Sequence, residues 1–278
     1  MSNEVYERIE VRPLAGALGA EVSGAQLGEL DDATFAEIHR AWLAHEVLFF
    51  RDQDLGPEQH KAFGRRFGAL QVHPFLHSRA PEGHPEIVVL ESSAERPVVA
   101  AGWHTDVTFA ERPPMASILR GVDVPAWGGD TMWASCRAAY DALSPTMQRM
   151  LEGLVAVHDT SKTFSRGAYP SERRPDANDT PTALHPVVRT HPETARKSIF
   201  VNPAFTLRIK GLRPAESDAL LKFLYQHVTT PEFTCRFHWT KNAVALWDNR
   251  CTQHRVVADN LKAYRRMERV TVEGDRPA

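Results

Sequence analysis

The feature that most constrains the fold is a series of short apolar runs that begins at residue 87 and continues nearly to the end of the chain. The runs are rich in β-branched and aromatic residues, and Gly, Pro, Asn and Asp separate them, as they separate strands. The expected strands are Ile87–Leu90, Trp103–Phe109, Ser117–Val122, Asp130–Trp133, Ser198–Val201, Thr234–Trp239, Val244–Trp247 and Met267–Val272. Many short strands of this kind are typical of a β-sandwich or barrel.

Helices are expected before this region and at three places within it. Asp31 precedes a segment with helical apolar spacing, and Pro57 begins a second helix that stops at Gly68. The apolar run Val47–Phe50 between them indicates a buried strand. Further segments are an opening strand at Tyr6–Val11 and helices at Cys136–Leu143, Ser144–Leu154 and Pro214–Val228, which should pack outside the sheet. The pattern predicts an α+β, mainly β protein.

The chain shows no internal repeat and no interdomain linker, so one domain over residues 1–278 is expected. Its polar, proline-rich stretch Ser161–Thr182 lacks periodicity and predicts a long loop or lid. A chain of this length buries a core without disulfides or a structural metal. The fold is therefore not expected to depend on a metal.

Charge and cysteine content exclude several classes of function. The 33 Lys and Arg residues against 35 Asp and Glu give a formal net charge of -2, which argues against nucleic acid or an anionic membrane as a partner. No segment has the roughly 20 apolar residues that span a membrane. Three widely spaced cysteines, Cys136, Cys235 and Cys251, indicate buried reduced thiols. We expect a soluble, cytoplasmic protein.

A histidine and an acidic residue two positions apart occur at three places: His84-Pro-Glu86, His104-Thr-Asp106 and His191-Pro-Glu193. The central proline of the first and third copies lacks a backbone donor and favours a turn. The second copy lies in WHTDVTF, which is rich in β-forming residues. Residues i and i+2 of a strand project from one face about 7 Å apart. His104 and Asp106 are therefore predicted to converge on one metal ion.

His254 is the predicted third ligand, since it ends ALWDNRCTQH, where an apolar strand runs into a polar turn. Two imidazoles and one carboxylate on one face of a metal leave the opposite face open, as in non-haem iron(II) oxygenases. The alternative is that Cys251-Thr-Gln-His254 forms half of a zinc site. No Cys-x-x-Cys pair accompanies it, which disfavours zinc.

Two arginines on the expected C-terminal strand offer sites for anions. Arg265 can hold a carboxylate through two parallel hydrogen bonds. Arg269 lies on the same face about 13 Å away, whereas Arg266 and Glu268 face the other side as an ion pair. Two inward arginines near a metal indicate two different anions. A turn, Gly-Gly-Asp, places the Thr131 hydroxyl where it could share the carboxylate with Arg265.

Together these residues resemble the TauD/TfdA family of 2-oxoglutarate-dependent dioxygenases. The resemblance covers nearly the whole chain, through PLAGALGAEVSG, VLFFRDQ, WHTDVTF, GGDTMWAS, LHPVVRTHPET, FVNPAF, WDNRCTQH and RVTVEGDRPA. Its most specific part is WHTDVTF combined with WDNRCTQH and the downstream arginine. It implies a distorted double-stranded β-helix, a cupin-like jelly roll with flanking helices and a metal at one mouth. It also implies that Thr131 and Arg265 bind the distal carboxylate of 2-oxoglutarate.

The resemblance further implies the cofactors and the reaction. Fe(II) would be held by His104, Asp106 and His254, while 2-oxoglutarate chelates it through the keto oxygen and adjacent carboxylate and O2 takes the remaining position. Oxidative decarboxylation gives succinate and carbon dioxide, and a substrate carbon is hydroxylated. Where that carbon carries a sulfonate or aryloxy group, the product collapses to release sulfite or a phenol. The protein positions and shields the oxidant. A homo-oligomer, a dimer or tetramer, is expected.

Four residues match the substrate pocket of the taurine dioxygenases in this family. Arg269 matches the arginine that binds the sulfonate, and His73 matches a histidine that assists it. Phe164 and Phe205 match aromatic residues that line the pocket. The resemblance thus implies a small anionic organic substrate.

Two positions depart from that pattern. Leu76 stands where taurine dioxygenases have a tyrosine, and Ala100 where they have an asparagine, so the amine-facing polar groups are lost. We expect taurine or a related alkylsulfonate, with an aryloxyalkanoate (phenoxy acid) or an alkyl sulfate as alternatives within the family. A non-catalytic cupin-like binding module or a zinc hydrolase is the alternative of another class, and it leaves Thr131 and Arg265 unexplained.

Overall fold

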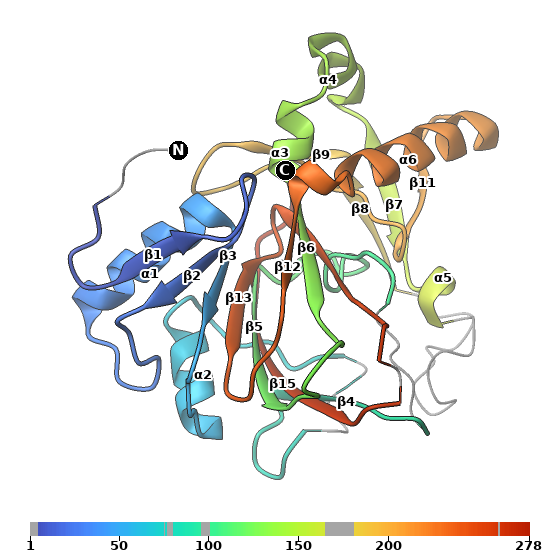
Figure 1. Ribbon diagram of the computed structural model, residues 1–278. Coiled ribbons are helices and arrows are strands. Elements are labelled where there is room, and N and C mark those ends of the chain that lie inside the picture. The colour runs from blue at the N-terminus through green and yellow to red at the C-terminus, as the bar shows by residue number, and fades with distance from the viewer. Residues whose placement is uncertain (1–4, 75, 77–79, 96–100, 165–180, 261) are drawn as a thin grey trace.

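The computed structural model describes residues 5–74, 76, 80–95, 101–164, 181–260 and 262–278, and within these ranges the chain is rich in β-structure (Figure 1). The strands form four sheets, one of which is much larger than the others. The strands are β1 (Glu10–Pro13), β2 (Ala20–Ser23), β3 (Val47–Phe50), β4 (Ile87–Ser92), β5 (Ala116–Asp123), β6 (Thr131–Ser135), β7 (Val155–Asp159), β8 (Thr182–Pro186), β9 (Val188–Thr190), β10 (Lys197–Ile199), β11 (Thr206–Ile209), β12 (Thr234–Phe237), β13 (Val244–Asp248), β14 (Thr252–Val256) and β15 (Arg265–Val272).

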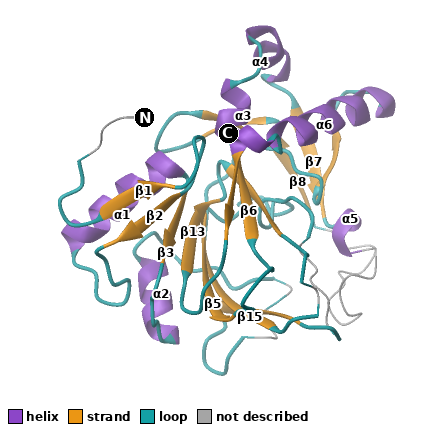
Figure 2. Cartoon of the chain, in the orientation of Figure 1, coloured by secondary structure: helices purple, strands orange, loops and turns teal. Residues whose placement is uncertain are grey.

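Helices flank the sheets, as predicted (Figure 2). They are α1 (Asp32–His45), α2 (Pro57–Arg65), α3 (Cys136–Asp141), α4 (Pro145–Leu151), α5 (Ser161–Phe164) and α6 (Pro214–Val228), with a 3-10 turn at Pro231–Phe233. The Asp31 carboxylate accepts a hydrogen bond from the backbone N–H of Thr34, which caps α1. Pro57 opens α2 and Pro214 opens α6, where the missing N–H carries no cost.

The largest sheet has seven strands in the order β1-β2-β3-β13-β5-β15-β4. All neighbours in it are antiparallel except β2 and β3, which are parallel. Both of its faces are covered, so β3 is buried at every position. Leu48 and Phe50 pack among the residues of α1 and α2, which lie on the outer face of this sheet (Figure 1). The alternate residues, Val47 and Phe49, point to the inner face.

The inner face of this sheet packs against a second sheet of three strands, β12-β6-β14. Aromatic side chains fill the space between the two layers. Phe49 of β3 stacks on Phe237 of β12 with ring centroids 4.2 Å apart, and Trp133 of β6 meets Trp247 of β13 edge to face. Two facing antiparallel sheets with an aromatic core agree with the predicted sandwich or barrel.

The other two sheets, β11-β7-β8 and β9-β10, lie with α3, α4 and α6 at one end of the molecule (Figure 1). Leu221 and Leu224 of α6 join a core that also contains Ile209 of β11 and Ala139 of α3. One face of α6 is therefore buried, as its apolar spacing predicted. The 165–180 part of the expected loop lies outside the described residues, whereas Ser161–Phe164 is helical rather than part of a loop.

The strand predicted at Trp103–Phe109 is wrong. His104 makes an isolated antiparallel bridge with His254, and a turn follows it at once. Val107 has φ of 51°, and this left-handed conformation is incompatible with an extended strand. His104 and Asp106 therefore do not share the face of a strand. The turn places the Asp106 carboxylate instead.

Smaller differences concern strands at the edges of the molecule. The opening strand is β1 at Glu10–Pro13 rather than Tyr6–Val11, because pairing with β2 begins only at Glu10. Six strands had not been expected: β2, β7, β8, β9, β11 and β14. Most of these are short or carry exposed positions, so their apolar pattern is weak. None of the helices in the described ranges is long and apolar enough to cross a membrane.

Candidate active site

Three potential metal ligands converge where the His104 bridge meets β14. The carboxylate oxygen Oδ1 of Asp106 lies 3.9 Å from Nε2 of His104 and 4.0 Å from Nε2 of His254. One ligand atom from each residue falls within 4.8 Å of the other two. The sequence placed His254 where an apolar strand runs into a polar turn, whereas the structure places it after that turn, within β14. The three side chains have the donor types of a 2-His-1-carboxylate metal site.

Backbone pairing fixes the two histidines relative to each other. The N–H of His104 donates to the carbonyl of His254 at 3.0 Å, and the N–H of His254 donates to the carbonyl of His104 at 2.8 Å. The Thr105 hydroxyl donates to the carbonyl of Thr252 at 2.8 Å, which extends the attachment by one residue. Nδ1 of His104 lies 2.9 Å from the carbonyl of Gly102. A proton on Nδ1 satisfies that contact and leaves Nε2 of His104 as a lone-pair donor.

The electrostatics of the three groups suit a metal. Burial lowers the pKa of His104 and lowers that of His254 well below its usual value. Burial opposes ionisation of Asp106, but the Arg269 guanidinium and the two imidazoles outweigh it and hold the pKa of that carboxyl well below its usual range. Two neutral imidazoles and one carboxylate are the protonation states in which these side chains bind a metal.

Arg269 contacts the site directly. Its Nη1 donates to Oδ1 of Asp106 at 2.7 Å, and both side chains are buried. Its Nε has no hydrogen-bond partner within the part of the chain that the structure describes. The sequence predicted an inward arginine that serves a substrate anion. The structure places Arg269 in the cavity and adds an ion pair with the carboxylate of Asp106 that had not been predicted.

Arg265 lines the same cavity, and part of its hydrogen-bonding capacity is unused. Its side chain is 6% exposed, and Nε and Nη2 have no partner among the described residues. Burial lowers the pKa of its guanidinium to about 10, so it remains a cation at neutral pH. Nearby, Oγ1 of Thr131 accepts from Nε1 of Trp239 at 2.9 Å, which leaves its own proton available for another acceptor. A buried cation next to a hydroxyl donor is suited to a carboxylate.

Gly129 allows this arrangement. Its φ of 67° is in the left-handed region, and a Cβ at this position would come within 3.3 Å of Cδ of Arg265. Any other residue would be strained and would crowd the arginine. The turn before Thr131 thus requires glycine for a reason that the sequence alone had not shown.

A cavity of about 390 Å³ contains all of these groups, a size typical of ligand pockets. It is lined by the three metal-ligand candidates, by Thr131, Arg265 and Arg269, and by His73, Leu76, Leu90, Gly102, Trp103, Val107, Phe109, Leu119, Lys162, Thr163, Pro203, Ala204, Phe205, Trp247 and Val256. Of the predicted substrate residues, His73, Leu76 and Phe205 therefore line it. Ala100 and the side chain of Phe164 lie outside the described residues. Lys162, Leu119 and Trp247 had been missed: Lys162 and Leu119 come from segments with no motif, and Trp247 begins the motif WDNRCTQH but was not assigned to the site.

A buried network of hydrogen bonds supports the turn that carries Asp106. Oγ1 of Thr108 lies 3.0 Å from Nδ1 of His158 and accepts from Nδ2 of Asn202 at 3.1 Å. The Asn202 Oδ1 in turn accepts from the backbone N–H of Phe205 at 2.9 Å. Burial lowers the pKa of His158 to about 3, so the imidazole is neutral. This network joins the turn that carries Asp106 to the loop that carries Phe205.

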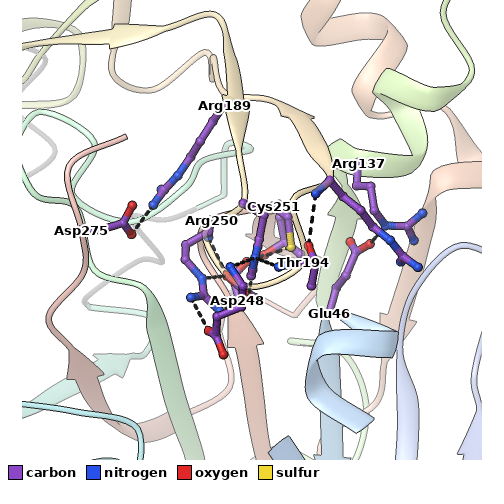
Figure 3. Close-up of polar contacts among 12 residues, drawn as sticks. Glu46, Arg137, Arg189, Thr194, Asp248, Arg250, Cys251 and Asp275 are labelled. Carbon is purple, nitrogen blue, oxygen red and sulfur yellow. Dashed lines mark hydrogen bonds and ion pairs between the residues drawn. The ribbon is translucent and has the colours of Figure 1, made fainter. Parts of the chain in front are cut away.

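A second group of potential ligands, His191, Asp248 and Cys251, lies in a separate buried cluster. Figure 3 shows Asp248 and Cys251 of this cluster beside Arg250. Here Asp248 Oδ1 accepts from Nε of Arg250 at 2.9 Å, and Oδ2 accepts from Nη2 of Arg250 at 2.7 Å. Nε2 of His191 is 2.9 Å from the same Oδ2. Burial raises the pKa of the Cys251 thiol well above its usual value. Both carboxylate oxygens are engaged and the thiol is protonated, so this cluster is a buried ion pair that fixes the β13–β14 turn.

The fold and the site together define a class. Two facing sheets hold a 2-His-1-carboxylate set in one cavity with a buried arginine, two of whose nitrogens lack hydrogen-bond partners among the described residues; the ligand set is that of non-haem iron enzymes. Comparison with known proteins identifies the family. Residues 10–271 match the family described as "Taurine catabolism dioxygenase TauD, TfdA family", and the chain belongs to it.

Individual relatives agree with this assignment. The chain is 37% identical to an alkylsulfatase of Acinetobacter baylyi, over 97% of this chain and 86% of the relative. It superposes with a TM-score of 0.85 and 42% identity on a putative alpha-ketoglutarate-dependent taurine dioxygenase from Burkholderia xenovorans, covering 97% and 94% of the two chains. A structure of AAD-2 in complex with Mn(II) and N-oxalylglycine matches with a TM-score of 0.82 and 31% identity, over 97% and 98% of the two chains.

The protein is thus an Fe(II)- and 2-oxoglutarate-dependent dioxygenase that uses O2 and acts on a small organic molecule, as the sequence predicted. Its sheet-rich architecture is the cupin-like one of TauD dioxygenases. Other relatives have names that refer to sulfonates, sulfate esters and (S)-phenoxypropionate. These names span the substrate classes that the sequence left open.

Proposed function

We propose that His104, Asp106 and His254 hold Fe(II), and that Thr131 and Arg265 hold the distal carboxylate of 2-oxoglutarate. One observation carries this assignment: Nε and Nη2 of the buried Arg265 guanidinium lack hydrogen-bond partners among the described residues, and Arg265 lines the cavity that holds the three ligand atoms. A buried cation is costly unless an anion pairs with it. When bound, the metal and co-substrate supply the oxidant that hydroxylates a substrate carbon.

We also propose a finer description of the fold and a cellular compartment for the protein. The two facing sheets support a distorted double-stranded β-helix, a jelly roll, within one domain over residues 1–278. The three cysteines are buried, free thiols, which supports a reducing compartment such as the cytoplasm. We further propose that the protein forms a homo-oligomer, a dimer or tetramer.

We propose a substrate with an anionic head and an apolar tail, an alkyl sulfate or alkylsulfonate. Arg269 and His73 line the cavity, and Arg269 contacts the proposed metal ligand Asp106, so these two side chains can bind the head. Leu76, Phe109 and Phe205 are buried apolar side chains that can surround the tail. Among the described lining residues, Asp106 is the one acidic side chain, and Arg269 already pairs with it. An ammonium such as that of taurine therefore lacks an evident partner.

Each residue then has a defined task in the reaction. Arg269 and His73 hold the sulfur-bearing head, so that the carbon next to the head faces the metal ligands. The apolar wall keeps water from the reacting carbon. Hydroxylation of that carbon in an alkyl sulfate gives a hemiacetal sulfate, whose C–O bond to sulfate breaks as the hydroxyl loses its proton. The products are an aldehyde and sulfate. A sulfonate gives an aldehyde and sulfite by the corresponding C–S cleavage.

A matched pair of substrates tests this proposal. Taurine and 1-propanesulfonate have the same shape and differ by an ammonium in place of a methyl group. An unsatisfied buried polar group costs about 1–3 kcal/mol, so kcat/KM for 1-propanesulfonate should exceed that for taurine about 5- to 150-fold. Propyl sulfate and a phenoxy acid complete the panel, with succinate formation as the measurement. A preference for taurine, or turnover of the phenoxy acid alone, would contradict the proposal.

A further inference from the structure

A chain of three hydrogen bonds ends on the carboxylate of Asp106. Nε1 of Trp247 donates to Oδ1 of Asn249 at 2.9 Å, and Nδ2 of Asn249 donates to Oγ of Ser117 at 2.9 Å. The Ser117 hydroxyl donates to Oδ2 of Asp106 at 2.9 Å. Ser117, Asn249 and Trp247 are all at most 1% exposed, so water does not compete for these groups. All three bonds run in the same direction, from the indole to the carboxylate.

The indole N–H of Trp247 is a donor and never an acceptor, so the atom of Asn249 that faces it is the amide oxygen. The Asn249 NH2 group must then face Ser117, whose oxygen accepts this bond. Ser117 has one hydroxyl proton, and that proton is left for Oδ2 of Asp106. Trp247, at the far end of the series, thus fixes the donor-to-acceptor direction of all three hydrogen bonds.

The other oxygen of Asp106, Oδ1, is the one within 4.0 Å of both imidazole Nε2 atoms. We infer that Ser117 is a positioning residue that keeps Asp106 a one-oxygen metal ligand by engaging Oδ2. This inference rests on the metal site proposed above. It assigns a task to a serine that lies in β5, eleven positions beyond the ligand and outside every motif of the sequence.

The way in which Asp106 binds decides how much of the metal stays open. His104, Asp106 and His254 would hold the metal through two imidazoles and one carboxylate oxygen, which would leave positions open for 2-oxoglutarate and O2. A second oxygen of Asp106 on the metal would take one of those positions. The hydrogen bond from Ser117 therefore protects the reactivity of the site rather than its affinity for substrate.

Two variants break the chain in different ways. Ser117→Ala removes the last donor. Asn249→Asp keeps the shape but replaces the NH2 donor with an acceptor, so the Ser117 proton is drawn away from Asp106. Loss of a partner of a metal ligand typically costs about 10- to 100-fold in metal affinity or activity. We expect both variants to lower kcat for succinate formation about 10- to 100-fold, with KM for 2-oxoglutarate and for propyl sulfate within about threefold of the parent enzyme.

Mn(II) titration supplies a measurement that does not depend on turnover. The dissociation constant should rise about 10-fold or more in Ser117→Ala. Asn249→Asp should also bind Mn(II) more weakly, although its added negative charge by itself would tighten binding. Ser198→Ala is the matched control, because Ser198 is an equally buried serine whose Oγ has no hydrogen-bond partner among the described residues. It should bind Mn(II) and turn over as the parent enzyme does.

The outcomes separate clearly. Parent-like Mn(II) binding and kcat in Ser117→Ala would overturn the inference. An equal loss of Mn(II) affinity and kcat in Ser198→Ala would also overturn it, because it would show a general destabilisation of the core. A higher KM for 2-oxoglutarate or propyl sulfate with unchanged kcat would also overturn the inference. If the parent protein itself bound no Mn(II), the proposed metal site would fail and the role of Ser117 with it, which is a different result from failure of the variants alone.

Discussion

Replacement of Arg265 by methionine tests the co-substrate site most sharply. The Arg265 side chain is 6% exposed, and two of its nitrogens lack partners within the described part of the chain. Methionine keeps most of the apolar stem and removes the charge. If the distal carboxylate of 2-oxoglutarate pairs with this guanidinium, the variant leaves that carboxylate buried and unpaired. Truncating one partner of a buried, hydrogen-bonded charge pair costs about 2–5 kcal/mol.

This cost converts to a weakening of 2-oxoglutarate binding by about 30- to 5,000-fold, since about 1.4 kcal/mol corresponds to a factor of ten. Calorimetric titration of the Mn(II)-loaded protein with 2-oxoglutarate measures it directly. Arg266→Met is the matched control, because Arg266 is the next residue of β15 and pairs with Glu91 and Glu268 on the other side of the strand. The control should bind 2-oxoglutarate normally. A dissociation constant for Arg265→Met within about threefold of the parent value would refute the assignment.

Three further predictions concern the substrate, the metal and the core. Arg269→Met should weaken the binding of alkyl sulfates and strengthen that of Mn(II), because it removes a positive charge that pairs with Oδ1 of Asp106. In steady-state assays, an unchanged KM for propyl sulfate would contradict the role of Arg269 as the anion site. Leu76→Tyr supplies a hydroxyl that can form a hydrogen bond worth about 0.5–1.5 kcal/mol. It should therefore raise kcat/KM for taurine relative to 1-propanesulfonate about 2- to 12-fold. No change in this ratio would show that the substrate tail does not reach residue 76. Burial lowers the pKa of His60 to about 4 and that of His158 to about 3, so below pH 6.5 the unfolded chain binds protons that the folded chain does not, and stability must fall as the pH falls. Between pH 7 and 5, the free energy of unfolding measured with urea should fall by about 2 kcal/mol less in His60→Gln than in the parent protein. An equal fall in both proteins would mean that His60 is protonated in the folded state.

The strongest periodic segments were predictable from the sequence. Helix α6 matches its predicted range, because Leu221 and Leu224 form an apolar stripe between an N-terminal proline and a polar turn. Strand β3 was found because an uninterrupted apolar run fits a strand that is buried on both faces. Both signals are local and need no knowledge of distant partners.

The surroundings of the site depend on contacts between distant parts of the chain, and the sequence does not show these. His104 and Asp106 were selected on the expectation of a strand, yet a bridge and a turn with positive φ at Val107 bring them together. The bond from Ser117 to Asp106 follows from the register of β5 with β13, which no local pattern encodes. The pairing of Arg269 with Asp106 likewise arises from packing between elements that lie 163 residues apart.

The central claim is that one metal ion binds at His104, Asp106 and His254. Mn(II) titration of the purified protein, followed by calorimetry, tests it most directly when His254→Ala is compared with Cys251→Ser from the separate buried cluster. We expect the parent protein and Cys251→Ser to bind one ion per chain with similar affinity, and His254→Ala to bind Mn(II) far more weakly while remaining folded. Retained binding in His254→Ala, or its loss in a folded Cys251→Ser, would place the metal elsewhere and contradict the account.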